Sequence, residues 1–401
     1  MKKSGYADLP LHNGKVPRWL AERMSKMGGA IMEAIVIEYG KSEVLKRLSD
    51  PAWFQSLGCV LGMDWHSSGI TTSVMGALKS SLNPIAKELG IYVCGGRGKH
   101  SRKTPDELLL IAEKTGLDGK ELVRSSRLSA KVDNTAIQDG FQIYLHSFIV
   151  SDEGEWAVVQ QGMNGASGYA RRYHWHSSEL KQFTEEPHTF IYGRNQGSIL
   201  NLTDKNAYET KNGIISIARE EPARMIAEIK KIKLPAHHDV QQKDVDIKRL
   251  GAVLALAQEL PVQDFESLLL LQGLGPRTLQ SLTLVSEVIY GTSSRFQDPA
   301  RFSFAHGGKD GHPFPVPTQV YDESISVLKT AVEKAKIDRS DKLKAIASLS
   351  KASQRMEEDF VPSGDLQSVI EKERNDSWKY GGRTVNGWAK KPQSEQLNLF
   401  D

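Results

Sequence analysis

Runs of β-branched and aromatic residues in the first half of the chain predict strands. Turn-forming residues separate the two longest runs, which predicts a hairpin. The runs lie at residues 88–96, 141–150, 155–160, 189–192 and 198–202. Short helical segments and glycine-punctuated turns are expected before the first run. Residues 1–205 are therefore predicted to form a mixed α+β domain around a largely antiparallel sheet.

Beyond residue 205 the apolar positions recur at helical spacing, so the fold class changes to all-helical. Residues 265–290 read as a helix, a tight turn and a second helix. Further helices are expected at 214–231, with Pro222 as the point of any break, and at 245–260, 321–337 and 340–357. The overall prediction is an α+β protein with a helical domain at 206–362. The polar residues 363–401 are expected to form a flexible tail.

A length of 401 residues supports two or three domains. The chain has 39% hydrophobic and 25% charged residues, which is ordinary for a globular protein. No apolar run approaches a membrane span, and the first residues lack a secretory segment. We therefore expect a cytoplasmic, nucleoid-associated protein with no membrane partner. Its two cysteines offer no zinc cluster.

A net charge of +3 is too small to indicate a polyanionic partner, so local clusters must decide. Two clusters could neutralise DNA phosphates. They comprise Arg97, Lys99, Arg102 and Lys103 in one segment and Arg171 and Arg172, among aromatic residues, in another. The alternative for each is a solvated loop or strand edge. The first cluster is not an ATP-binding loop, because Val93 and His100 occupy positions that need glycine and Ser or Thr.

The segment 268–282 carries the most specific signal. Gly273 and Gly275 allow a sharp turn and a close approach of the backbone to a ligand, while Leu274 can anchor the turn between two helices. Pro276 suits a first helical turn. The segment resembles the helix-hairpin-helix motif of DNA repair and replication proteins.

That resemblance implies contact with duplex phosphates. Free amides at the start of the second helix would face an oxyanion, and Arg277 and Thr278 would add side-chain contacts. Such contacts are independent of base sequence. The alternative is a pair of helices that uses glycines only to turn.

The chain ends in a second signal, Gln396-Leu-Asn-Leu-Phe-Asp401. Leu397, Leu399 and Phe400 could fill an apolar cleft while Gln396 makes anchoring hydrogen bonds. This peptide resembles the bacterial sliding-clamp-binding motif, which implies the clamp as a partner beside double-stranded DNA. The alternative is a tail that folds back onto its own domain.

Several stretches together resemble a prokaryotic family catalogued as a domain of unknown function, seven-sixty-three. They are residues 91–105, 156–164, 169–175 and 304–311. This resemblance implies one architecture across most of the chain and brings no established reaction.

Base excision is the first candidate reaction. In helix-hairpin-helix glycosylases a catalytic aspartate follows the second helix, and Asp298 occupies a similar place here. It would stabilise an oxocarbenium-like sugar or activate water after base flipping. Arg277 stands where lyase-active members carry lysine, which argues against a Schiff base. The alternative is that Asp298 caps a helix beginning at Pro299.

A glycine-rich segment downstream offers a second group of catalytic candidates. Lys309 could contact a phosphate or act as a nucleophile, and His306 and Asp310 could transfer protons. The alternative is a turn-rich connection. A glycosylase needs no cofactor.

The rival enzyme is a metal-dependent nuclease, whose divalent ion would take ligands from 64–66, 174–176 or 237–239. None of these segments has a fixed ligand spacing, and the metal is left open. A non-catalytic DNA-binding adaptor is the rival from another class. The prediction is thus a DNA-binding protein of repair or replication-coupled processing, with base excision ahead of strand cleavage.

Overall fold

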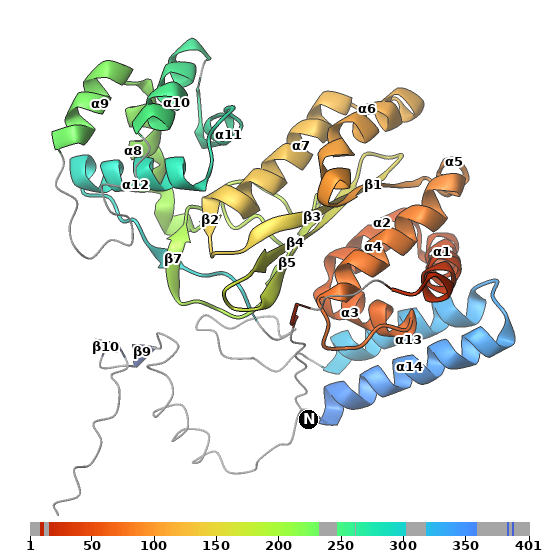
Figure 1. Ribbon diagram of the computed structural model, residues 1–401. Helices are drawn as coiled ribbons and strands as arrows, with labels where there is room; N and C mark the ends of the chain where they lie inside the picture. Colours follow the sequence, from red (N-terminus) through yellow and green to blue (C-terminus); the bar gives the residue numbers. More distant parts are fainter. Residues whose placement is uncertain are drawn as a thin grey trace, which may run out of the picture.

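The computed structural model describes residues 9–11, 16–231, 247–260, 262–301, 318–358, 383–384 and 387–388. A five-stranded antiparallel sheet lies at its centre, in the order β1-β3-β4-β5-β6 (Figure 1). Its strands are β1 (Ile91–Arg97), β3 (Gln142–Ser151), β4 (Trp156–Asn164), β5 (Tyr169–His176) and β6 (Phe190–Tyr192). The expected antiparallel hairpin is formed by β3 and β4. The predicted α+β class is confirmed.

A smaller antiparallel sheet in the order β2-β7-β8 adjoins the large one. It contains β2 (Ile137–Gln138), β7 (Ser198–Asn201) and β8 (Phe296–Gln297). Two further short strands, β9 (Arg383–Thr384) and β10 (Gly387–Trp388), pair with each other.

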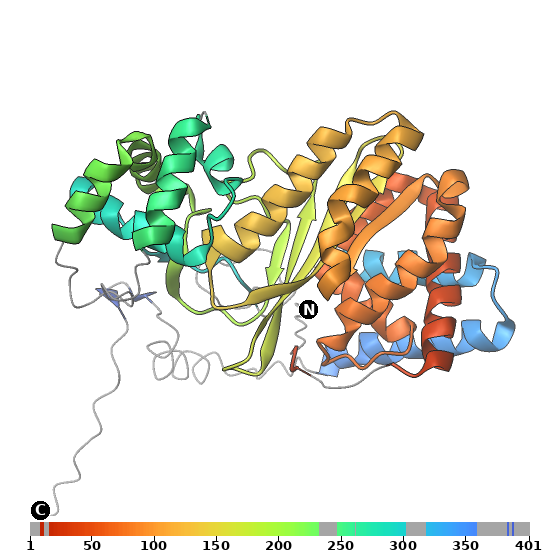
Figure 2. The ribbon, with the colours of Figure 1, turned by 45° about the horizontal axis from the view of Figure 1, so that its top comes forward.

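Side chains that alternate along the central strands enter two separate cores, because successive residues of a strand point to opposite faces. On β3, Phe148 and Val150 belong to one core and Ile149 to the other. On β4, Val158 and Val159 divide in the same way. The sheet is therefore covered on both faces (Figure 2), which explains why β4 and β5 are buried along most of their length.

One face is covered by the N-terminal helices. These are α1 (Arg18–Tyr39), α2 (Lys41–Ser49), α3 (Pro51–Val60), α4 (Gly69–Leu82) and α5 (Ala86–Leu89), with the short turn η1 (Asn83–Ile85) before α5. The prediction of short helices broken by glycine turns is wrong for α1, because this helix continues for 22 residues through Gly28 and Gly29. A Cβ on Gly29 would lie 2.8 Å from Ser81 Cβ. The glycine pair therefore permits close packing of α1 on α4 and does not mark a turn.

The opposite face is covered by a V-shaped pair of helices, followed by a helical cluster (Figure 1). The pair is α6 (Thr104–Thr115) and α7 (Gly119–Lys131), preceded by η2 (Gly98–Lys103) and followed by the π-helical turn η3 (Val132–Ala136). The cluster contains η4 (Lys205–Ala207), α8 (Tyr208–Arg219), α9 (Pro222–Lys231), α10 (Ile247–Glu259), α11 (Phe265–Leu269) and α12 (Pro276–Tyr290). The expected helix at 214–231 is broken before Pro222.

The last helix pair, α13 (Thr318–Lys334) and α14 (Arg339–Glu358), packs on the N-terminal layer. Leu328 and Leu349 enter the core formed by α1 to α4, whereas α8 to α12 belong to the other core. A single helical domain at 206–362 is therefore wrong, because its two halves bury their apolar faces against opposite sides of the sheet. Within the described residues, none of the helices combines the length and apolarity needed to span a bilayer.

Candidate functional site

The turn between α11 and α12 lies on the surface of the helical cluster. Gly273 adopts φ +85°, in the region that favours glycine. Leu274 points inward and is only 2% exposed, while Gly273 and Arg277 are exposed. The chain thus anchors the turn through one leucine and leaves its backbone accessible.

The first turn of α12 has unused hydrogen-bond donors. Its N-cap is Gly275, which offers no side chain, and Pro276 has no N–H. Leu279 is the first residue whose amide bonds back, to Gly275 O at 3.0 Å. The amides of Arg277 and Thr278 have no partner in the described chain. Two donors therefore stand at the positive end of a 15-residue helix.

Two cations and an amide hold the carbonyls of this turn. Lys131 Nζ donates to Leu274 O at 2.6 Å, Arg249 Nε donates to Gly273 O at 3.3 Å, and Gln138 Nε2 donates to Pro276 O at 2.7 Å. Burial lowers the pKa of Lys131, and the positive charge of Arg249 lowers it further. The turn thus brings like charges together, which an anion placed between them would stabilise.

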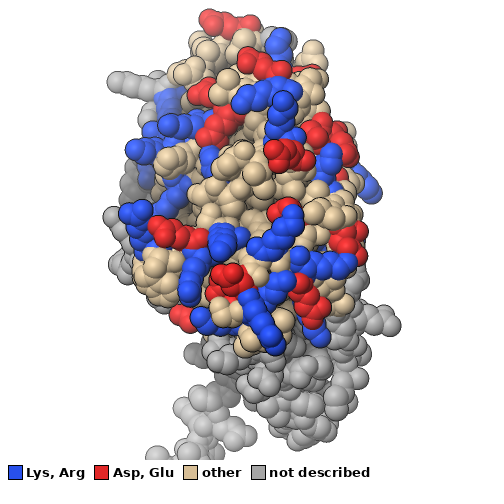
Figure 3. All heavy atoms as spheres, turned by 90° about the vertical axis from the view of Figure 1, so that its right-hand side faces the viewer, with Lys and Arg blue, Asp and Glu red and all other residues tan. Residues whose placement is uncertain are grey.

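The basic loop η2 follows β1 directly, and Arg97, Lys99, Arg102 and Lys103 are all exposed. The guanidinium of Arg97 lies over the ring of Tyr144, 5.8 Å from its centroid. Strand β3 packs against both η2 and η3, and η3 packs against α12. The two basic elements therefore flank the start of β3. On the side of the molecule that carries α1, α13 and α14, cationic and anionic side chains are interspersed (Figure 3).

The second basic cluster is corrected by the structure. Arg171 and Arg172 are both 0% exposed, because β5 is a central strand with helices over both faces. Arg172 donates to Gln55 Oε1 and lies over the ring of Phe54. Burial lowers its pKa to about 10. Neither arginine can reach a DNA phosphate from this position.

Asp298 is likewise a buried structural group. Its carboxylate accepts two hydrogen bonds from Arg171, at 3.1 and 2.9 Å, and Arg171 also donates to Asp139 at 2.7 Å. The amide of Ala300 donates to Asp298 Oδ1 at 2.9 Å, and residues 299–301 are not helical, so the carboxylate caps a loop there. A carboxylate engaged in this way is not available as a catalytic base, and we correct that assignment. The side chain nevertheless forms part of the wall of a cavity.

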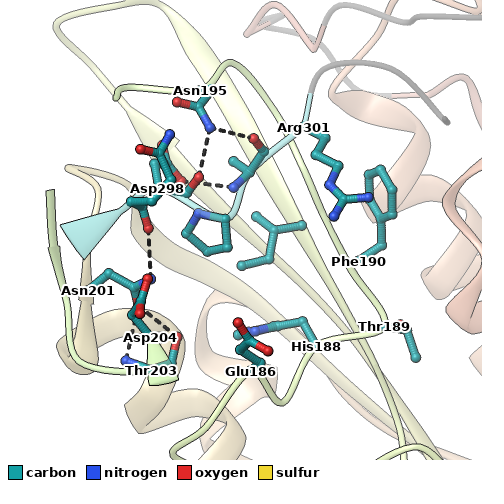
Figure 4. A pocket seen from close by; sticks show the side chains of 14 residues that line it. Glu186, His188, Thr189, Phe190, Asn195, Asn201, Thr203, Asp204, Asp298 and Arg301 are labelled. Atoms are coloured by element: carbon teal, nitrogen blue, oxygen red, sulfur yellow. Dashed lines mark hydrogen bonds between the residues drawn. The ribbon is translucent and has the colours of Figure 1, made fainter. Parts of the chain in front are cut away.

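That cavity has a volume of about 530 Å³ and lies beside strands β6 and β7 (Figure 4). Residues 186–191, 201–204 and 297–301 supply most of its wall. Glu186, His188, Asp204, Asp298 and Arg301 are the ionisable residues of its wall. Asp298 is paired with Arg171, and Asp204 Oδ1 accepts from Asn206 N at 2.8 Å. Nothing in the sequence analysis singled out Glu186 or His188.

A buried carboxylate orients His188. Its Nε2 lies 2.5 Å from Asp133 Oδ1, and Asp133 Oδ2 accepts from Gln160 Nε2 at 2.5 Å and Trp175 Nε1 at 3.0 Å. Burial raises the pKa of Asp133, while the hydrogen bonds from His188 and Trp175 act in the opposite direction. Asp133 belongs to the π-helical turn η3, a rare local conformation that is frequent at functional sites.

Glu186 has a strained backbone. Among the described non-glycine residues, Glu186 has a positive φ, at +43°. It also precedes Pro187, and a proline disfavours a helical backbone conformation at the residue before it. Its amide donates to Thr203 O at 2.9 Å, which helps to hold this conformation. The only sequence signal for it was the Glu-Pro-His order, which alone is not specific.

The remaining sequence candidates lie outside the described residues. They are the catalytic candidates His306, Lys309 and Asp310 and the clamp-binding residues Gln396, Leu397, Leu399 and Phe400. For the metal hypothesis, His174 is buried and its Nδ1 lies 3.0 Å from Leu48 O. Across the described chain, no three His, Cys, Asp or Glu side chains are grouped to hold a metal ion.

The fold and site define a two-core α+β protein with an amide-lined basic turn and a separate polar cavity. The chain belongs to the family described as "Protein of unknown function (DUF763)", whose model matches residues 5–316. No curated protein and no solved structure matches it. Family membership confirms the resemblance noted in the sequence and leaves the activity to be inferred from the residues.

Proposed function

We propose that the protein binds double-stranded DNA through its phosphate backbone, with the α11–α12 turn as the principal contact. The observation that carries the proposal is the pair of unpartnered amides of Arg277 and Thr278 beside Lys131 and Arg249. A phosphate oxygen there would accept two backbone hydrogen bonds and offset the repulsion between two cations. Leu274 acts as the anchor, and Gly273 and Gly275 let the phosphate approach closely.

The basic loop η2 supplies a second contact. Arg97, Lys99, Arg102 and Lys103 carry no base-reading geometry, so we assign them to phosphates on the same duplex. A duplex that bridges both elements would neutralise several charges, and its affinity would fall steeply with salt. We assign no side-chain contact to Thr278, because the residue as a whole is only 5% exposed.

The wider role that we propose is DNA repair or replication-coupled DNA processing, with base excision as the reaction. The 530 Å³ cavity favours an enzyme over a pure adaptor, because an adaptor needs no nucleotide-sized concavity. Metal-dependent strand cleavage remains the rival reaction. The peptide 396–401 would recruit the protein to the sliding clamp: Leu399→Ala with Phe400→Ala should abolish clamp binding in a pull-down and leave duplex affinity unchanged.

Fluorescence anisotropy with a labelled duplex tests the backbone proposal. Arg277→Ala should weaken binding uniformly across unrelated sequences and lower the salt slope by about 1. Arg18→Ala is the matched control, since Arg18 is exposed on α1 and pairs with Glu22 of the same helix. Equal salt slopes for Arg277→Ala and the parent, with unchanged affinity, would exclude the turn as a phosphate site.

A further inference from the structure

We propose that the cavity beside β6 and β7 is a hydrolytic site that accepts one nucleotide turned out of the duplex and breaks its N-glycosidic bond. This inference rests on the proposed duplex binding and assigns the chemistry to Glu186, His188 and Asp133 in place of Asp298. A space of about 530 Å³ is in the range of small-ligand pockets. A duplex cannot enter it, so a target nucleotide must leave the base stack first.

His188 is placed as the general base. Asp133 Oδ2 accepts from Gln160 and Trp175, and we assign the proton shared between Asp133 and His188 to His188 Nε2, which leaves the lone pair on Nδ1. Nδ1 has no hydrogen-bond partner in the described chain, and it is not among the buried atoms sealed from solvent. His188 lines the cavity with a side chain that is only 6% exposed, and we place Nδ1 toward the cavity. The carboxylate behind the ring fixes this tautomer and stabilises the imidazolium formed when a proton is taken up.

Glu186 is placed to stabilise positive charge on the sugar. Its side chain is exposed, lines the same cavity and lies on the same side of it as His188 (Figure 4). A strained backbone at a cavity residue is kept only when the surrounding structure over-determines it, and such strain is typical of functional positions. A carboxylate at this place favours an oxocarbenium-like transition state.

Arg301 supplies a site for the phosphate of the same nucleotide. It lies across the cavity from Glu186, with its guanidinium over the Phe190 ring at 5.9 Å (Figure 4). Among the residues that the structure describes, no carboxylate lies within 4.0 Å of that guanidinium. A planar guanidinium recognises phosphate in a bidentate manner.

The step balances with water as the only co-reactant. The C1′–N bond breaks and its electron pair leaves with the base. Water attacks C1′ as its proton passes to His188 Nδ1, and that proton then neutralises the departing base through solvent. The products are one free base and an abasic site, and no oxidant or reductant is needed.

One helical segment joins this cavity to the DNA-binding turn. Lys131 holds the carbonyl of Leu274, and Asp133, two residues later, holds His188. A duplex docked at the turn therefore lies next to the segment that orients the catalytic base. This adjacency is what an enzyme acting on a flipped nucleotide requires.

The test uses the full chain with end-labelled duplexes containing uracil, hypoxanthine or 8-oxoguanine, incubated with EDTA and then treated with alkali to reveal abasic sites. At least one duplex should give product. His188→Asn and Glu186→Gln should each lower its rate by at least about 100-fold while duplex affinity stays within about twofold. Glu179→Gln, at an exposed residue outside the cavity, should retain the parental rate.

The outcomes separate the two proposals. Duplex binding without product from any of the three substrates would overturn the hydrolytic site and leave backbone binding intact. Product that survives both cavity substitutions would overturn the residue assignment. Absence of duplex binding by the parent would instead overturn the proposed function. Glu186→Gly adds a further criterion. This variant should have a higher melting temperature than the parent and should still lose activity. If Glu186 were only structural, the more stable variant would keep its activity.

Discussion

Lys131 Nζ donates a hydrogen bond to the carbonyl oxygen of Leu274, 2.6 Å away, although 143 positions separate the two residues. This contact ties the end of α7 to the surface turn between α11 and α12. It also places a half-buried ammonium group beside Arg249, where the pKa of Lys131 is lowered.

We expect Lys131→Met to reduce the salt slope of duplex binding by about 1 and to remove a pH dependence. Because the pKa of Lys131 is lowered, its positive charge is lost at a lower pH than that of an ordinary lysine. Parental affinity should therefore fall as the pH rises toward 10.5, the usual lysine value, and the variant should lack this fall. Lys120→Met, on the exposed first turn of α7, is the control. Superimposable salt and pH curves for Lys131→Met and the parent would contradict the prediction.

The two glycines of the turn should respond differently to alanine. Gly273 has φ +85°, so Gly273→Ala should lower the free energy of unfolding by about 1 kcal/mol. Gly275 has φ −130°, and a Cβ there would meet only Arg249 Nη2 at 3.8 Å. Gly275→Ala should therefore change stability by no more than about 0.5 kcal/mol. Its methyl group should nonetheless weaken duplex binding about fivefold, because it occupies the phosphate approach. Urea titrations and anisotropy measure the two effects, and unchanged affinity in Gly275→Ala would count against the close approach.

The β3–β4 hairpin, the break before Pro222 and the helix–turn–helix at 265–290 were predictable because each depends on local sequence. Strand propensity, a proline and a glycine pair each determine the backbone conformation of only a few neighbouring residues. The placement of α13 and α14 was not predictable in this way. Their apolar positions show that one face is buried, and the sequence does not say against which layer.

The basic pair at 171–172 misled the sequence analysis for a related reason. Arginines among aromatic residues indicate a nucleic-acid surface only if the strand has a solvated face. Here both faces of β5 are covered, and the carboxylates that pair with Arg171 come from positions 139 and 298. The cavity was missed because Asp133 and His188, which form its dyad, are 55 positions apart.

Asp298→Asn should behave as a stability variant. Removing one carboxylate from a buried Arg171 pair leaves a charge poorly compensated, at a cost of about 3 kcal/mol. The midpoint of urea unfolding should fall accordingly, with any loss of activity following the loss of folded protein. A variant with the parental midpoint and no turnover would instead restore Asp298 as a catalytic residue.

Stability should fall on acidification because of buried neutral histidines. Burial lowers the pKa of His146 to about 4 and the pKa of His174 well below 6.5. The unfolded chain therefore binds more protons than the folded chain between about pH 6.5 and 4, so stability is complete above this window and is lost within it. His146 alone contributes up to about 3 kcal/mol. Urea unfolding at pH 7.0, 5.5 and 4.5 measures the slope, which His146→Phe should reduce. A slope unchanged in that variant would contradict the assignment.

Because Leu328 and Leu349 complete the core of the N-terminal layer, α1 and α3 cannot reach their final packing until α13 and α14 have been synthesised. During translation the sides of α1 and α3 that α13 and α14 later cover stay exposed to solvent while some three hundred residues are synthesised. Such exposure of apolar surface favours aggregation. A chain terminated before α13 would still contain the residues of the turn, the basic loop and the cavity. It should nevertheless accumulate in inclusion bodies.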